Sequence, residues 1–177
     1  MNHPTRRRFL QGVSALSVVS IAGCSVLSDN STPTPTPEYD TLEETSTYRS
    51  DDVGLSLPEA VPRADSPEEA ELVVVHGNPS VEPDQAVTWL TDGRAVALLG
   101  DAAAETWREW TSSDAYAEAF DDRGRAESDP APHLLVAGAN ETTARTNRFS
   151  WADLPSNAEL VEALDEAVAD IVAWRST

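Results

Sequence analysis

The chain contains no lysine and only one cysteine, Cys24, among its 177 residues. A single cysteine excludes an intrachain disulfide. The 12 basic residues are therefore all arginines, set against 31 acidic residues, and they form no basic stripe that could neutralise a nucleic acid backbone. The sequence also lacks the Gly-x-Gly-x-x-Gly and Walker phosphate-binding patterns and the Gly-x-Ser-x-Gly elbow of serine hydrolases. These absences argue against nucleic acid, nucleotides and that hydrolase class.

The amino-terminal segment has the layout of an export signal. Three arginines, from Arg6 to Arg8, precede a mildly apolar stretch that runs from Phe9 to Gly23. That stretch is shorter than the ~20 predominantly apolar residues that span a bilayer. The run Thr5-Arg6-Arg7-Arg8-Phe9-Leu10 resembles the twin-arginine export signal. The resemblance implies that Arg6 and Arg7 are read by the twin-arginine translocase during export.

The residues that end this segment resemble a lipoprotein lipobox. Ile21-Ala22-Gly23-Cys24 has an aliphatic residue, two small residues and then the only cysteine. The resemblance implies removal of residues 1–23 and attachment of lipid to Cys24. We therefore expect the mature chain to be anchored to the extracytoplasmic face of the cell membrane. The alternative is an uncleaved membrane anchor that contains an incidental cysteine.

The charge of the mature chain is extreme. Removal of the three signal arginines changes the formal net charge from −19 to −22. Such self-repulsion destabilises a compact chain at low ionic strength, and molar salt screens it. An acidic, lysine-free chain with this signal resembles the surface lipoproteins of salt-loving archaea. The carboxylates are spread along the chain, so we expect most of them to form a solvated surface rather than a catalytic or metal site.

Residues 24–47 are predicted to be a disordered stalk. Their centre, residues 31–37, alternates threonine or serine with proline, which favours polyproline II and cannot form a core. Asn30 begins an N-glycosylation sequon, although so short a motif also arises by chance. The predicted organisation is a signal peptide over 1–23, a lipidated stalk over 24–47 and one globular domain over 48–177.

The globular part is predicted to be α/β. Continuously aliphatic runs favour buried parallel strands, and a more alternating stretch favours an edge strand. The predicted strands are 72–75, 95–99 and 134–137, with weaker candidates at 53–57 and 145–151. The predicted helices are 84–91, with Gly93 as its carboxyl-terminal cap, 101–110, 114–120 and a last helix after a Ser156…Glu159 capping box. This alternation predicts a small three-layer domain with a mostly parallel sheet of about four or five strands.

Residues 84–100 also resemble the helix, glycine and strand unit of class I glutamine-amidotransferase-like domains. The stretch covers Asp84 to Thr91, Gly93 and the aliphatic run 95–99. The resemblance implies a related fold. Those enzymes use a cysteine nucleophile, and the only cysteine here is the predicted lipid site, so the resemblance does not imply their activity.

Candidate ligand residues follow the three main strands. In open parallel sheets ligands bind beyond the carboxyl ends of the strands, so we expect the loops after 75, 99 and 137 to converge. The side chains in these loops are His76, Asn78, Ser80, Asp101, Asn140 and Thr142. The alternative is that they serve only as turn and cap residues. Asn140 also begins a second sequon, Asn140-Glu141-Thr142.

More specific sites receive little support. Ser80 and His76 lie close enough in sequence for a nucleophile and base, but without an elbow motif. His76 and His133 lack a recognisable metal-ligand spacing, and parallel strands would place them at opposite ends. We expect neither a metal nor a cofactor. Trp107 and Trp110 are expected in the core, with an exposed partner surface as the alternative.

The sequence therefore predicts the cellular location of the protein more clearly than its activity. The favoured interpretation is a lipid-anchored, non-catalytic binding or interaction module of unknown ligand at the surface of a halophile, and a protein is one candidate partner. The first alternative is a hydrolase or transferase whose site lies at the strand ends. The second is an accessory subunit of a membrane transport or redox complex.

Overall fold

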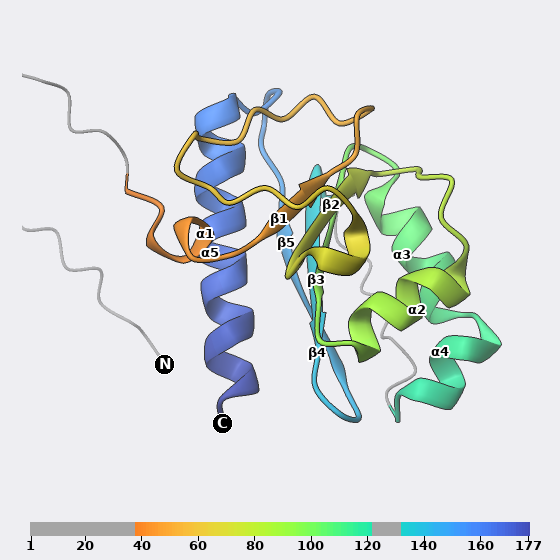
Figure 1. Cartoon of the computed structure of the whole chain (residues 1–177). Coiled ribbons are helices and arrows are strands. Elements are labelled where there is room, and N and C mark those ends of the chain that lie inside the picture. The colour runs from red at the N-terminus through yellow and green to blue at the C-terminus, as the bar shows by residue number, and fades with distance from the viewer. Residues whose placement is uncertain (1–37, 122–131) are drawn as a thin grey trace, which may run out of the picture. The chain divides into compact units, whose positions relative to one another are not determined.

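The computed structural model describes residues 38–121 and 132–177 (Figure 1). The predicted signal residues Arg6 and Arg7, the predicted lipid site Cys24 and the sequon at Asn30 lie outside the described residues. Within the described part, no helix is both long enough and apolar enough to cross a membrane.

Five strands form one mixed sheet in the order β1-β2-β3-β4-β5. They are β1 (Thr47–Arg49), β2 (Leu72–His76), β3 (Ala95–Leu99), β4 (Leu134–Ala139) and β5 (Ala144–Phe149). β1, β2 and β3 are parallel, whereas β4 runs antiparallel to β3, and β5 antiparallel to β4. The prediction of a parallel strand at 134–137 is therefore wrong in direction. A continuously apolar run indicates that both faces of a strand are buried. An antiparallel strand in the middle layer of a three-layer fold is buried in the same way.

Helices cover both faces of the sheet, as Figure 1 shows. On one face lie α2 (Pro83–Thr91), α3 (Ala103–Thr111) and α4 (Asp114–Ala119), and on the other lie α1 (Asp40–Glu43) and α5 (Asn157–Arg175). A short 3-10 helix, η1 (Pro67–Glu69), precedes β2. The predicted three-layer α/β domain with a sheet of four or five strands is thus confirmed.

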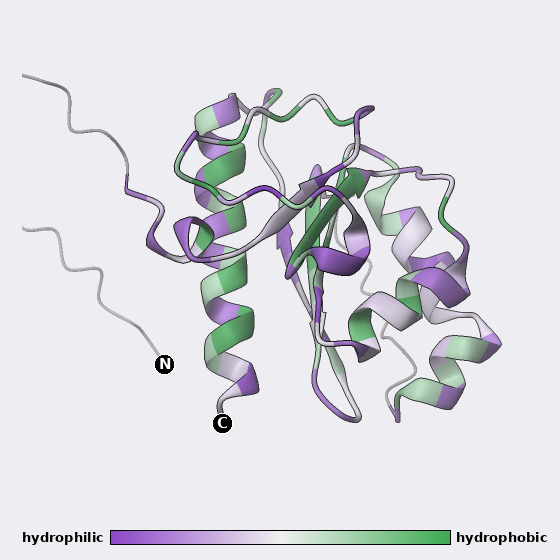
Figure 2. Cartoon of the chain, in the orientation of Figure 1, coloured by the Kyte–Doolittle hydropathy of each residue, from purple (hydrophilic) through white to green (hydrophobic). Residues whose placement is uncertain are grey.

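The central strands divide their side chains between two hydrophobic cores. Leu72 and Val74 of β2 face the core under α5, whereas Val73 and Val75 face the core under α2 and α3. This division follows from the period of two in a strand. In Figure 2 β2 is correspondingly hydrophobic along most of its length.

Two predicted helix boundaries have the expected chemistry. Gly93 follows α2 with φ +82°, and the N–H groups of Gly93 and Arg94 donate to the carbonyls of Leu90 and Trp89, which is the Schellman pattern. At the start of α5, the Ser156 hydroxyl accepts from the Glu159 N–H at 3.3 Å, and the Glu159 carboxylate accepts from the Ser156 N–H at 2.8 Å. The predicted capping box is therefore present.

The folded unit begins earlier than predicted. Its described part begins at Glu38, and Leu42 of α1 is completely buried in the core on the α5 side of the sheet. Residues 38–47 therefore belong to the domain rather than to the stalk. The predicted strand at 53–57 is also wrong: Val53, Leu55 and Leu57 are buried in the same core but form no ladder. The alternation of apolar and polar residues indicates that one side of the segment is buried, and an extended segment without strand pairing can also bury one side.

Candidate functional site

The direction of β4 separates the predicted ligand residues into two groups. In the sheet register, Leu99 at the end of β3 lies opposite Leu134 at the start of β4. His133 therefore lies at the same edge as His76 and Asp101, where β2 and β3 end. Asn140 and Thr142 follow the end of β4 and lie at the opposite edge. The expectation that all the predicted loops converge is wrong for these two residues.

His76 is the exposed last residue of β2, and its side chain forms one local hydrogen bond among the described residues. Its Nδ1 atom accepts from the backbone N–H of Asn78 at 3.2 Å. Ser80 is exposed and forms no hydrogen bond with His76 among the described residues. The Ser80–His76 pairing considered from the sequence therefore has no geometry of a nucleophile and base here.

The glycine that follows β2 is explained by packing. The N–H of Gly77 donates to the carbonyl of Leu99 at 2.7 Å, and the buried Thr106 hydroxyl donates to the carbonyl of Gly77 at 2.6 Å. A Cβ atom at Gly77 would lie 2.9 Å from the Gly100 carbonyl oxygen. Close approach of two backbones therefore requires Gly77, so this glycine is no evidence of a ligand.

Asp101 and His133 come near each other at the same edge. The His133 Nε2 and Asp101 Oδ1 atoms are 3.9 Å apart, and the Asp101 side chain is 93% exposed. Because the carboxylate lies in solvent, a contact of this length contributes little to holding either side chain. The described residues contain no group of three or more His, Cys, Asp or Glu side chains arranged to hold a metal ion. The expectation that His76 and His133 lie at opposite ends of parallel strands is therefore wrong, because β4 runs antiparallel to β3.

A polar cleft of about 300 Å³ lies at the carboxyl end of β1, where the sequence indicated no site. It opens between the end of β1 and the segment 63–65, which runs along the outer side of β1. The N–H of Thr47 donates to the Pro62 carbonyl at 2.8 Å, and the N–H of Ala64 donates to the Thr47 carbonyl at 3.0 Å. Its charged lining consists of Arg49, Asp51, Arg63 and Asp65, and we call it the arginine cleft.

Each arginine of the cleft donates one hydrogen bond to a backbone carbonyl of the loop that follows β1. The Arg49 guanidinium donates to the Val53 carbonyl at 2.7 Å, and that of Arg63 donates to the Leu57 carbonyl at 3.3 Å. A guanidinium has five N–H donors, so most donors of both groups remain unused by described residues. No described carboxylate lies within 4.0 Å of either group. Two cations with spare donors therefore line one cleft.

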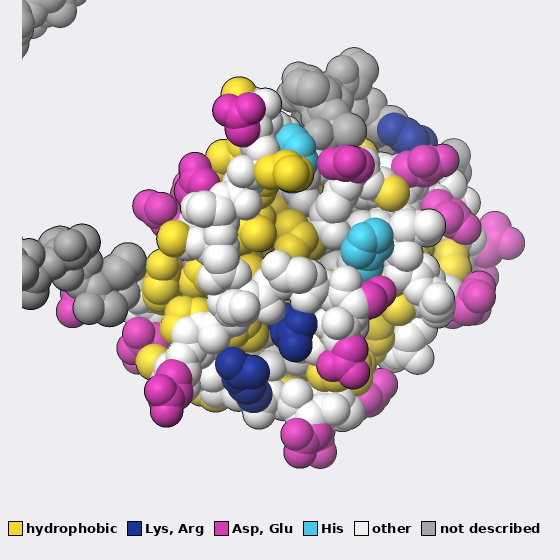
Figure 3. Space-filling model, turned by 90° about the horizontal axis from the view of Figure 1, so that it is seen from above, with side chains coloured by type: hydrophobic (Ala, Val, Ile, Leu, Met, Phe, Trp, Pro, Cys, Tyr) yellow, Lys and Arg dark blue, Asp and Glu magenta, His cyan; other side chains and the backbone are white. Residues whose placement is uncertain are grey.

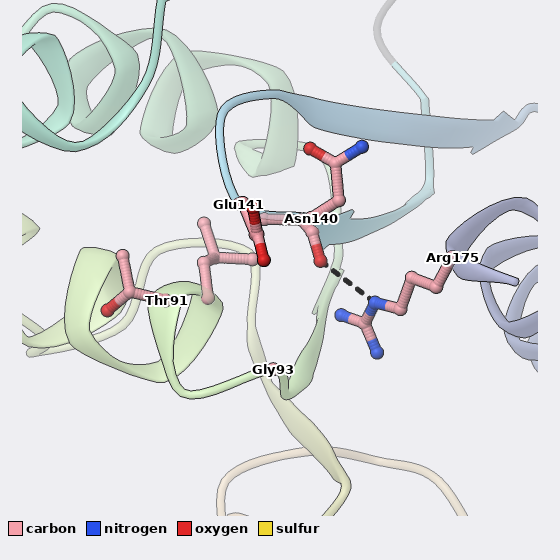
Figure 4. A pocket seen from close by; sticks show the side chains of 7 residues that line it. Thr91, Gly93, Asn140, Glu141 and Arg175 are labelled. Atoms are coloured by element: carbon pink, nitrogen blue, oxygen red, sulfur yellow. Dashed lines mark hydrogen bonds between the residues drawn. The ribbon is translucent and has the colours of Figure 1, made fainter. Parts of the chain in front are cut away.

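The opposite edge of the sheet has a second cavity of about 340 Å³ (Figure 4). It lies between the end of α2, the β4–β5 turn and Arg175 near the end of α5. The Arg175 Nε donates to the Ala139 carbonyl at 2.9 Å, and its Nη2 donates to the Arg94 carbonyl at 3.0 Å. Partial burial lowers the pKa of Arg175 from its ordinary value by removing the cation from water. Arg175 thus joins α5 to the last residue of β4 and to the residue that precedes β3.

The tryptophan pair belongs to the core. Trp107 and Trp110 of α3 are buried and meet edge to face, with ring centroids 6.4 Å apart. The alternative of an exposed tryptophan surface is therefore wrong. Among the described residues, only Leu154 and Val172 are large hydrophobic side chains with substantial exposure. Carboxylates are instead scattered over the face shown in Figure 3.

Sequence reasoning missed Arg49 and Arg63 because neither belongs to a motif. The available signal was the scarcity of basic residues after the signal segment, but only the fold brings two that are 14 positions apart to one cleft. Comparison with known proteins provides no further guide: no protein-family model matches the chain, and no curated protein or solved structure matches it.

Proposed function

We propose that this chain is an exported, lipid-anchored binding module that takes a small carboxylate-bearing ligand in the arginine cleft. The twin-arginine pattern at Arg6 and Arg7 and the lipobox cysteine, Cys24, support export and anchoring to the outer face of the membrane. The threonine- and proline-rich stalk would hold the domain away from that surface. The acidic composition supports a high-salt setting.

The observation that carries the ligand site is the convergence of Arg49 and Arg63 on one cleft. A planar guanidinium matches the geometry of a carboxylate and can donate two parallel hydrogen bonds to it. Both arginines are already positioned by bonds to loop carbonyls. Such preorganisation reduces the entropy lost when a ligand binds.

The rest of the cleft narrows the class of ligand. Asp51 and Asp65 also line it, and their negative charge disfavours a highly charged anion such as a polyphosphate. A ligand with one or two carboxylates and additional hydroxyl or amino groups could use both kinds of lining. The cleft lies along β1 and reaches Asp51, just past the carboxyl end of that strand.

A paired-ligand thermal-shift experiment tests this function. The chain without its signal is melted in molar KCl with succinate, glutarate or glutamate, and with the corresponding neutral amides. We expect at least one carboxylate, but not its amide, to raise the melting temperature, since a ligand at 100 times its Kd adds about 2.7 kcal/mol to stability. The substitutions Arg49→Gln and Arg63→Gln should remove the shift.

The matched control is Arg145→Gln. Arg145 lies on β5, the edge strand on the opposite side of the sheet from β1, and pairs with Asp170 at 3.1 Å. This variant should respond to the ligand as the unaltered chain does. A carboxylate response that survives Arg63→Gln, or the absence of any response across the three pairs, would overturn the proposed ligand site.

A further inference from the structure

The sequon Asn140-Glu141-Thr142 forms the tip of the hairpin between β4 and β5. The N–H of Asn140 donates to the Thr143 carbonyl at 3.0 Å and closes the turn. Asn140, Glu141 and Thr142 are all exposed. The motif is therefore presented on a tight surface turn, outside both hydrophobic cores.

The Asn140 side chain is held in one orientation by its own turn. Its Oδ1 atom accepts from the N–H groups of Thr142 at 3.2 Å and Thr143 at 2.9 Å. These bonds use the oxygen and leave the Nδ2 group without a hydrogen-bond acceptor among the described residues. In Figure 4 the amide of Asn140 points away from the cavity beneath it. The nitrogen atom to which a glycan attaches is thus accessible.

Thr142 supplies the second element of the motif. Its hydroxyl contacts only the hydroxyl of Thr143, at 3.5 Å, among the described residues. A transferase that recognises the third residue of the sequon could therefore reach it. Since both residues are exposed in the folded domain, access does not depend on whether transfer precedes or follows folding.

We propose that Asn140 is an N-glycosylation site. This inference rests on the proposed export, because the sequon is read on secreted chains. The co-reactant is a sugar attached through phosphate to a lipid carrier. The Asn140 Nδ2 attacks the anomeric carbon, the new C–N bond forms as the C–O bond to phosphate breaks, and that electron pair leaves with the phosphate. The Nδ2 proton passes to a base of the transferase.

Another exposed loop provides an internal comparison. Asn78-Pro79-Ser80 has asparagine and serine at sequon spacing, but proline at the middle position excludes it. Asn78 is exposed in the loop after β2. The substitution Pro79→Ala would convert this stretch into a sequon without altering the hairpin at 140–143.

The test is peptide mass analysis of the full chain, produced in a salt-loving archaeal host and isolated from its membranes. Cleavage at arginine places Asn140 in peptide 126–145, Asn78 in 64–94 and Asn30 in the peptide that ends at Arg49. We expect peptide 126–145 to carry a glycan. Thr142→Ala should remove it, while Thr142→Ser, which keeps the sequon, and Thr143→Ala, its matched neighbour, should retain it.

The two ways to fail are distinct. A chain that bears lipid on Cys24 but has an unmodified peptide 126–145 would overturn the glycosylation and leave the proposed export intact. A chain that retains residues 1–23 and carries no glycan would overturn both. Modification at Asn78 in the Pro79→Ala variant, with Asn140 still unmodified, would also overturn the assignment of Asn140.

Discussion

The carboxylate of Asp165, in the middle of α5, accepts a hydrogen bond from the backbone N–H of Leu42 at 2.9 Å, across 123 positions of sequence. The same oxygen accepts from the N–H of Thr41 at 3.0 Å. N–H groups in the first turn of a helix have no acceptor within the helix, and a negative charge is favourable there. One side chain of the last helix therefore holds α1 against α5.

Removal of this carboxylate should loosen α1. We expect Asp165→Ala to lower the free energy of unfolding by about 2 kcal/mol, because two backbone donors lose a charged acceptor. Chemical denaturation in molar KCl measures the change. Glu166→Gln, at an exposed position one residue further along α5, should be nearly neutral. Equal stability of the two variants would contradict the role of Asp165.

Close contact between α5 and β4 should make Gly138 intolerant of a side chain. A Cβ atom at Gly138 would overlap the Ile171 Cγ2 atom. We expect Gly138→Ala to cost about 1–3 kcal/mol through overpacking. Gly54→Ala, whose Cβ would have no neighbour within 4 Å, is the control. A double-mutant cycle with Ile171→Ala should show coupling, because the smaller side chain opens the required space; strict additivity would refute the contact.

The capping box of α5 should contribute to acid sensitivity. Hydrogen bonds from the Ser156 hydroxyl and then from its backbone N–H lower the pKa of Glu159 below its ordinary value. Since the folded-state pKa lies below the unfolded one, the stabilisation is present above the unfolded pKa and is lost as the pH falls through the folded one. Melting between about pH 6 and pH 3 should therefore show a smaller loss for Glu159→Gln than for the unaltered chain. Glu162→Gln, at an exposed position, should follow the unaltered chain, and three parallel curves would exclude the effect.

Stability should depend strongly on salt. Without the three arginines of the proposed signal, the formal net charge of the chain changes from −19 to −22. The Debye length grows from ~3 Å at 1 M to ~10 Å at 0.1 M, so repulsion between surface carboxylates increases on dilution. We expect the melting temperature to fall steadily as KCl is lowered over this range. An unchanged melting temperature would refute adaptation to high salt.

Local features of the fold were predictable where a short stretch contains its own explanation. The Schellman end of α2 at Gly93 and the Ser156–Glu159 capping box depend on residues only a few positions apart. The aliphatic run 95–99 was identified as a strand with its observed bounds. In contrast, α1 is a single turn whose buried Leu42 has no periodic pattern around it. Its stability comes from α5, which no local pattern could indicate.

The candidate site was less predictable because it depends on strand direction. An apolar run such as 134–137 states that both faces are covered, and it does not state which way the chain runs. Because β4 is antiparallel to β3, Asn140 lies at the opposite end of the sheet from His76, and His133 lies at the same end as His76. The arginine cleft depends on a similar long-range event, the pairing of segment 62–64 with the outer side of β1.

The sequence by itself determined the charge balance, the predicted export and lipid-attachment motifs, the α/β class and most helix ends, because each depends on composition or on neighbouring residues. Only the tertiary structure decided the direction of β4, the inclusion of residues 38–47 in the domain, the meeting of Arg49 with Arg63 and the exposure of the Asn140 turn. These features depend on contacts between segments distant in sequence, where burial and backbone pairing choose among arrangements that local patterns leave equivalent.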